Sequence, residues 1–187
     1  MAAELKYMKN RYFFSPGFVL GFLILLIFPT FIKAQISNVR LIDSRKNTAT
    51  VSSNVVLLEQ MVFDLINRTR EENGLKKLIW CEDAAKIARM HSSNMANFNF
   101  FSHTGTDGKR VSDRADSFGL RNWRLIGENI AYNAGFENPV ERAVYGWMNS
   151  PGHRQNILRD NWKETGIGIA VGPQGKYYIT QVFLQRK

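Results

Sequence analysis

Two imidazoles and one carboxylate are the residues of this sequence best suited to form a chemical site. His103 lies in the segment Phe-Ser-His-Thr, Glu128 in Gly-Glu-Asn-Ile-Ala, and His153 in Ser-Pro-Gly-His-Arg. Each lies in a loop or at the end of an element rather than inside a periodic apolar run. Because the three segments are far apart in sequence, these side chains can meet only in the folded protein. Together they can bind a first-row metal that keeps an open coordination position, or act as general acid–base groups.

The position of His153 predicts its charge. Ser150 is a favoured N-cap residue, and Pro151 is favoured at the first position of a helix, so His153 would be the third helical residue. The positive end of the helix dipole disfavours an imidazolium there. We therefore predict that His153 is neutral at pH 7 and available to a metal or as a hydrogen-bond acceptor.

Other polar residues have structural interpretations. His91 falls on the apolar face of a predicted helix, which favours a hydrogen-bonded core histidine. Asp107-Gly108 is a turn dipeptide, and Arg114 is expected to hold this loop by pairing with a carboxylate. Cys81 has no evident base in the sequence, so we expect no catalytic role for it. Two further side chains are expected to bond backbone groups around the site: Asn129 and Asn156.

Apolar spacing predicts the helices that must position these residues. A first helix begins near Val55 and ends at Gly74. A second follows Trp80 with one continuous apolar stripe, formed by Ala84, Ile87, Ala88, His91 and Met95. A third begins at Asn138-Pro139 and buries Val140, Ala143, Val144 and Trp147. The short helical turn after Ser150 completes the set.

The C-terminal part has strand character. Residues 165–171 alternate Ile and Val with small residues, residues 177–184 are aromatic and β-branched, and the Gly- and Pro-containing segment 172–175 separates them. This pattern predicts an antiparallel hairpin, and residues 126–131 predict a further extended segment. Helices followed by a terminal hairpin favour an α+β fold in which helices cover a small sheet.

The N-terminus has the pattern of an export signal. Three basic residues within the first eleven precede an uncharged stretch over residues 12–32, whose densest apolar part is 18–28. Ala34 then offers a small residue for cleavage, so we interpret residues 1–34 as a signal peptide. A retained membrane anchor is the alternative. The polar segment 35–53 is interpreted as a linker and 54–187 as the folded domain.

Composition limits the remaining classes. The 187 residues, 44% of them hydrophobic and 22% charged, suit one compact domain. A single cysteine excludes an intramolecular disulfide. Loss of residues 1–34 would remove four of 25 basic and one of 16 acidic residues, so the net charge falls from +9 to +6. Basic residues are scattered rather than clustered, so no nucleic-acid partner is expected; a weak attraction to anionic envelope polymers or lipids remains open.

Several motifs, taken in order, make the sequence resemble a known family. They are Phe-Ser-His-Thr, Gly-Glu-Asn-Ile-Ala, the run from Trp147 through Ser-Pro-Gly-His-Arg, and the closing Gly-Ile-Gly-Ile-Ala. Together they resemble the CAP superfamily (SCP/TAPS), which includes cysteine-rich secretory proteins, insect antigen 5 and plant pathogenesis-related 1. The short form of the Trp147 motif and the lack of disulfides are similar to its bacterial branch.

The resemblance implies an α-β-α sandwich, with a central antiparallel sheet between helices and a cleft on one side. It also implies that His103, Glu128 and His153 line that cleft. Since imidazoles are suitable ligands, His103 and His153 are the candidates to hold a divalent metal such as Zn²⁺ there. Many eukaryotic members carry a second acid three residues after the helix tryptophan, where this chain has Ser150. The cleft is therefore expected to lack one acidic group.

Three functions follow from these expectations. The first is an exported module that binds a lipid, a small molecule or an envelope component in the cleft, without enzymatic activity. The second is a metal-dependent hydrolase or protease in which His103 and His153 hold zinc and Glu128 is the base. The third is a purely structural cluster. The first is preferred, because the sequence shows no activated nucleophile and no set of oxyanion donors.

Overall fold

A computed structural model describes residues 54–187. The signal peptide or anchor predicted for 1–34 and the linker predicted for 35–53 lie outside the described residues. After a first helix over residues 54–72, the elements are β1 (Ile79–Trp80), α2 (Glu82–Asn97), α3 (Val111–Phe118), β2 (Trp123–Asn133), α4 (Pro139–Met148), α5 (Pro151–Ile157), β3 (Glu164–Val171), a 3₁₀ turn (Pro173–Gly175) and β4 (Tyr177–Arg186). None of the described helices is long and apolar enough to cross a membrane.

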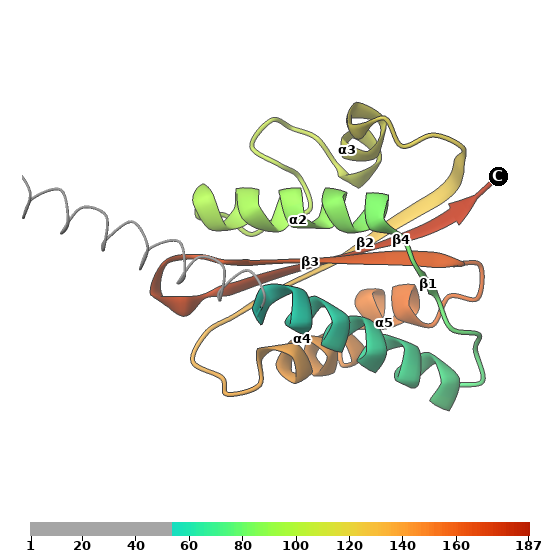
Figure 1. The fold of residues 1–187 in the computed structure, drawn as a ribbon, viewed down its shortest axis with the longest axis horizontal. Helices are drawn as coiled ribbons and strands as arrows, with labels where there is room; N and C mark the ends of the chain where they lie inside the picture. The colour runs from blue at the N-terminus through green and yellow to red at the C-terminus, as the bar shows by residue number, and fades with distance from the viewer. Residues whose placement is uncertain (1–53) are drawn as a thin grey trace, which may run out of the picture. The chain divides into compact units, whose positions relative to one another are not determined.

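The sheet lies between two layers of helices, as predicted. Its strand order is β1-β3-β4-β2, and Figure 1 shows α2 and α3 on one face and the first helix, α4 and α5 on the other. One apolar core joins the first helix, α4 and α5 to the sheet, with Trp147 and Phe183 among its largest members. A second core packs α2 and α3 against the opposite face through residues such as Ile87 and Leu184. The α+β sandwich is confirmed.

The sheet is mixed rather than wholly antiparallel. The long strands β2, β4 and β3 pair antiparallel, but the two-residue β1 pairs parallel with β3, with Ile79 opposite Glu164. The predicted hairpin is confirmed as β3 and β4, joined through the 3₁₀ turn. β2 extends beyond the predicted segment 126–131 at both ends, because its whole length pairs with β4.

Glycines in β3 let α2 pack directly on the sheet. A Cβ atom added to Gly166 would lie 2.0 Å from the backbone nitrogen of Ala85, and one added to Gly168 would lie 2.0 Å from that of Arg89. Both positions therefore require the absence of a side chain. The close approach fixes α2, and with it the histidine at its centre, relative to the strands.

β2 is an edge strand, and two of its backbone carbonyls accept hydrogen bonds from side chains of α4 and α5. The indole nitrogen of Trp147 in α4 donates to the Ile130 carbonyl (2.9 Å), and Asn156 Nδ2 in α5 donates to the Glu128 carbonyl (3.2 Å). Such bonds protect part of the edge from pairing with another chain. They also anchor α4 and α5 beside the residue that forms the centre of the candidate site.

α3 was not predicted. Its sequence, Val-Ser-Asp-Arg-Ala-Asp-Ser-Phe, shows no apolar stripe, and only Arg114 and Ala115 are buried. Asp113 begins this helix by accepting a hydrogen bond from the Arg110 backbone nitrogen (2.9 Å), and Gly119, at φ 85°, ends it. Its stability therefore comes from capping and polar contacts, which hydrophobic periodicity does not detect.

Candidate functional site

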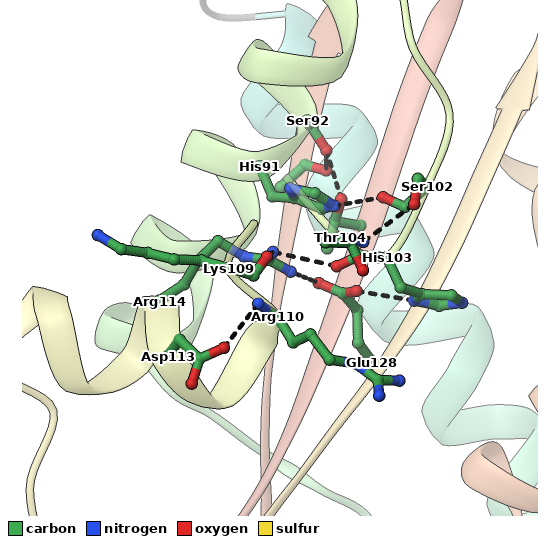
Figure 2. Close-up of polar contacts among 12 residues, drawn as sticks. His91, Ser92, Ser102, His103, Thr104, Lys109, Arg110, Asp113, Arg114 and Glu128 are labelled. Atoms are coloured by element: carbon green, nitrogen blue, oxygen red, sulfur yellow. Dashed lines mark hydrogen bonds and ion pairs between the residues drawn. The ribbon is translucent and has the colours of Figure 1, made fainter. Parts of the chain in front are cut away.

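Glu128 is the centre of the site. It lies in the middle of β2, not in a loop or at the end of an element as expected from the sequence, and its side chain is only 3% exposed. Nη2 of Arg114 in α3 donates to Glu128 Oε2 (2.5 Å), and Nδ1 of His103 lies 2.8 Å from Glu128 Oε1 (Figure 2). Both carboxylate oxygens are therefore engaged. The carboxylate predicted to pair with Arg114 is Glu128 itself.

Arg114 also organises the loop that carries His103. Its Nη1 donates to the backbone carbonyls of His103 (3.1 Å) and Lys109 (2.8 Å). The Asp107-Gly108 turn lies in this loop, where Asp107 accepts a hydrogen bond from the Lys109 backbone nitrogen. The role predicted for Arg114 as the residue that holds the loop is thus confirmed, and one guanidinium fixes both the loop and the carboxylate that orients His103.

His153 approaches the same place from α5. Its ring centre lies 6.4 Å from that of His103, and the ring planes differ by 37°. Asn129 Nδ2 donates to the His153 carbonyl (3.1 Å), and Asn156 Nδ2 donates to Asn129 Oδ1 (2.9 Å). The two asparagines therefore bond backbone groups around the site, as predicted. The structure brings His103, Glu128 and His153 together.

Burial lowers the pKa of His153 below its ordinary value, and the proximity of His103 lowers it further. The direction agrees with the predicted neutral imidazole, although the cause is different. The prediction relied on the dipole of α5, a helix of seven residues in which Ser150 is the N-cap but its side chain makes no capping bond. Removal from water and a neighbouring imidazole disfavour the charged form here.

His91 is a core residue, as predicted, and Cys81 is a core residue too. His91 is fully buried, Nε2 lies 2.9 Å from the Ser102 carbonyl, and burial is the main cause that lowers its pKa. Cys81 is also buried, and burial raises the pKa of its thiol. A thiol held in its protonated form is a poor nucleophile.

His103 and His153 alone are better placed to bind a metal ion than His103, Glu128 and His153 together. Two imidazoles on one tetrahedral Zn²⁺ would have ring centres about 5 Å apart, given Zn–N bonds of about 2.0–2.1 Å. The observed 6.4 Å is about 1 Å longer, so a bound ion would require the two rings to approach each other. Within residues 54–187 no group of three His, Cys, Asp or Glu side chains is arranged to hold a metal. His103 and His153 would hold the ion, and Glu128 would orient His103.

The family comparison agrees with this fold. The sequence model described as "CAP: Cysteine-rich secretory protein family" matches residues 63–183. Among curated relatives, the chain is 38% identical over 128 residues to "Uncharacterized membrane protein YlbC" of Bacillus subtilis (strain 168), covering 68% of this chain and 34% of the relative. It is 37% identical over 126 residues to "Uncharacterized protein YkwD" of the same strain, covering 67% and 48% respectively. The chain thus spans only a third to a half of these relatives.

Comparison with solved structures leads to the same family. An extracellular protein containing a SCP domain from Bacillus anthracis str. Ames superposes with a TM-score of 0.62 at 32% identity, covering 69% of this chain and 40% of that one. A cysteine-rich secretory protein from Staphylococcus aureus Mu50 gives a TM-score of 0.52 at 25% identity, covering 69% and 39%. The fold and the matching family model define a CAP-type domain. The chain belongs to the CAP, or cysteine-rich secretory protein, family.

Proposed function

We propose that this protein is an exported binding domain whose ligand contacts the imidazoles of His103 and His153. The observation that carries the proposal is the saturation of Glu128, which accepts from Arg114 at one oxygen and contacts His103 at the other. A carboxylate so engaged fixes the ring of His103 rather than reacting itself. His103, at 45% exposure, is open to a ligand, whereas Glu128, at 3%, is not.

The same contacts disfavour the hydrolase alternative. A general base must reach the water it activates with a free oxygen, and Glu128 is 3% exposed with both oxygens bonded. Catalytic zinc sites hold the ion with three protein ligands, whereas two imidazoles are available here. When bound, a metal would supply a Lewis-acid contact for a ligand, and the chain's own residues would supply its position.

Export and a ligand from the cell envelope are part of the proposal. The apolar N-terminal pattern supports export, and the B. anthracis protein is described as extracellular, while YlbC is described as a membrane protein. The net positive charge favours an anionic lipid or envelope polymer over a nucleic acid, since the basic residues form no cluster.

The test measures Zn²⁺ binding to the full chain by calorimetry, together with casein hydrolysis and thermal unfolding. His103→Ala and His153→Ala should each weaken Zn²⁺ binding by at least about tenfold. Glu71→Gln, which changes an exposed carboxylate outside the cluster, is the control and should bind Zn²⁺ like the parent protein. Native mass spectrometry of the exported chain should detect a copurifying molecule that the double histidine variant loses.

Two results would overturn the proposal. Casein hydrolysis that both histidine variants abolish would make the protein an enzyme. A large loss of thermal stability in both variants, with Zn²⁺ affinity and copurifying molecules unchanged, would make the cluster structural.

A further inference from the structure

Two exposed aromatic side chains lie next to the histidine site. Phe101 is 45% exposed and Tyr132 is 54% exposed, and their ring centres lie 4.8 Å apart with the planes at 63°. Phe101 lies two residues before His103, and Tyr132 lies near the end of β2, four residues after Glu128. Large rigid rings that remain in contact with water supply much of the contact area of binding surfaces, so this aromatic pair is a candidate ligand contact.

The aromatic pair is continuous with the histidine site. Alternate residues of a strand face the same side, so Glu128 and Tyr132 share one face of β2, about 13 Å apart along the strand. Glu128 contacts His103, and Tyr132 contacts Phe101, so residues 101–103 follow this stretch of the strand. The imidazole of His103 and the aromatic pair therefore belong to one surface, which has the length of a short oligosaccharide.

Buried groups hold residues 101–103 in place. The Ser102 carbonyl accepts a hydrogen bond from Nε2 of His91, a fully buried residue of α2 (2.9 Å, Figure 2). The next carbonyl, that of His103, accepts from Nη1 of Arg114 (3.1 Å). Because two successive carbonyls are fixed by side chains of the core, the backbone that carries Phe101 is set before any ligand arrives.

Tyr132 is fixed from below by its neighbour across the sheet. It pairs with Tyr178 of β4, and the two rings are stacked, with centres 6.2 Å apart and planes at 26°. Tyr178 is buried, so one face of the Tyr132 ring is covered and the exposed surface lies on the other face and the ring edge. A ligand that binds this face does not need to order the ring first.

The chemistry of the surface favours a sugar. A hexopyranose with equatorial hydroxyl groups presents a face of C–H bonds, whose slight positive charge is attracted to the negative face of an aromatic ring. Its hydroxyl groups can also bond the phenol of Tyr132 and the imidazole of His103. An acyl chain would cover the same rings but would remove these polar groups from water without replacing their hydrogen bonds. Linked pyranose rings therefore match the surface better than a lipid tail does.

We propose that Phe101 and Tyr132 form a carbohydrate subsite, on which one ring of a β-linked hexopyranose chain stacks while a neighbouring ring bonds His103. The subsite rests on the binding function proposed above, and it assigns the ligand to the glycans among the envelope polymers.

The experiment is an NMR titration of the ¹⁵N-labelled full chain with cellotriose and with N,N′,N″-triacetylchitotriose, which are both β-linked trisaccharides. Sorbitol, which carries hydroxyl groups but no ring, is the control probe. At least one trisaccharide should shift the amide signals of residues 101–103 and of Tyr132 saturably, whereas sorbitol should leave them unchanged.

Variants of the aromatic pair separate stacking from folding, which thermal unfolding checks. Phe101→Ala and Tyr132→Ala should each weaken trisaccharide binding about three- to tenfold, and Tyr132→Phe, which keeps the ring, should lose less. His103→Ala should also weaken binding, because it removes the imidazole. Tyr145→Ala is the matched control: Tyr145 is an exposed tyrosine of α4, in the helical layer on the other face of the sheet, and its loss should leave binding unchanged.

Zn²⁺ binding distinguishes the subsite from the function on which it rests. Tyr132→Ala keeps both imidazoles, so it should bind Zn²⁺ like the parent protein. The subsite is wrong if neither trisaccharide saturates, if sorbitol shifts the same signals equally, or if Phe101→Ala, Tyr132→Ala or His103→Ala binds normally. Zn²⁺ binding that still depends on the histidines would then leave the binding function in place. Binding to phosphatidylglycerol vesicles that Tyr132→Ala abolishes, without any trisaccharide binding, would make the surface a lipid contact and would also overturn the subsite.

Discussion

The buried contact between Arg114 and Glu128 should dominate the stability of the candidate site. Both side chains are 3% exposed, so Glu128→Gln removes the negative charge that compensates a buried guanidinium. Breaking a buried ion pair on one side costs about 3–5 kcal/mol. We expect about 3 kcal/mol, because the amide oxygen of the new glutamine can still accept from Arg114. For a domain of this size, that corresponds to a fall in Tm of about 10 °C.

Urea unfolding followed by circular dichroism measures this change, and Glu71→Gln is its matched control. Glu71 pairs with Lys77 at 3.2 Å, but these side chains are 52% and 60% exposed. An exposed pair contributes at most about 1 kcal/mol, so the control should lose little. If Glu128→Gln loses no more free energy of unfolding than Glu71→Gln, the buried cluster does not hold the site together and the reasoning is refuted.

Three further predictions concern pH, packing and the sheet edge. The pKa values of His91 and His153 are lowered in the folded state, so the unfolded chain takes up protons first as the pH falls. The free energy of unfolding should therefore be constant with respect to these two groups above about pH 6.5 and decrease below it. Urea titrations between pH 7.5 and 5 would measure this decrease, which should be smaller in His153→Gln. Gly168→Ala should lower the free energy of unfolding by about 3 kcal/mol or more, because its Cβ would meet the α2 backbone, whereas Gly152→Ala, where the added atom meets nothing within 4 Å, should change it little; equal losses would contradict the packing. Trp147→Phe should cost about 1–3 kcal/mol by leaving the Ile130 carbonyl of the β2 edge without its donor, a loss that thermal unfolding would detect and that an unchanged Tm would disprove.

Hydrophobic periodicity predicted the elements that bury apolar side chains. The stripe from Ala84 to Met95 became the buried face of α2, and Val140 to Trp147 became that of α4. The same signal missed α3, because its buried face consists mainly of an arginine that bonds a carboxylate and backbone carbonyls. Hydrophobic periodicity also could not predict the parallel pairing of Ile79 with Glu164, because residues so far apart in sequence pair only once the intervening elements are in place.

The sequence predicted which residues form the site but not the contacts that hold them in place. Residue type and motif resemblance identified His103, Glu128 and His153, and the structure places them together. The partner of Arg114 was known only as a carboxylate, because the spacing of residues 114 and 128 indicates no contact until α3 and β2 are placed. The lowered pKa of His153 was attributed to a helix terminus, whereas its causes are burial and the second imidazole, which only coordinates reveal.

The proton position on the ring of His103 tests the central claim most directly. If Glu128 orients this ring, Nδ1 carries the proton that the carboxylate accepts, and Nε2 is the nitrogen left for a ligand. Long-range ¹H–¹⁵N correlation spectra of the full chain at pH 8 distinguish the two forms. We predict a proton on Nδ1 of His103, lost from that nitrogen in Glu128→Gln. A neutral ring that carries its proton on Nε2 in the parent protein would contradict the account.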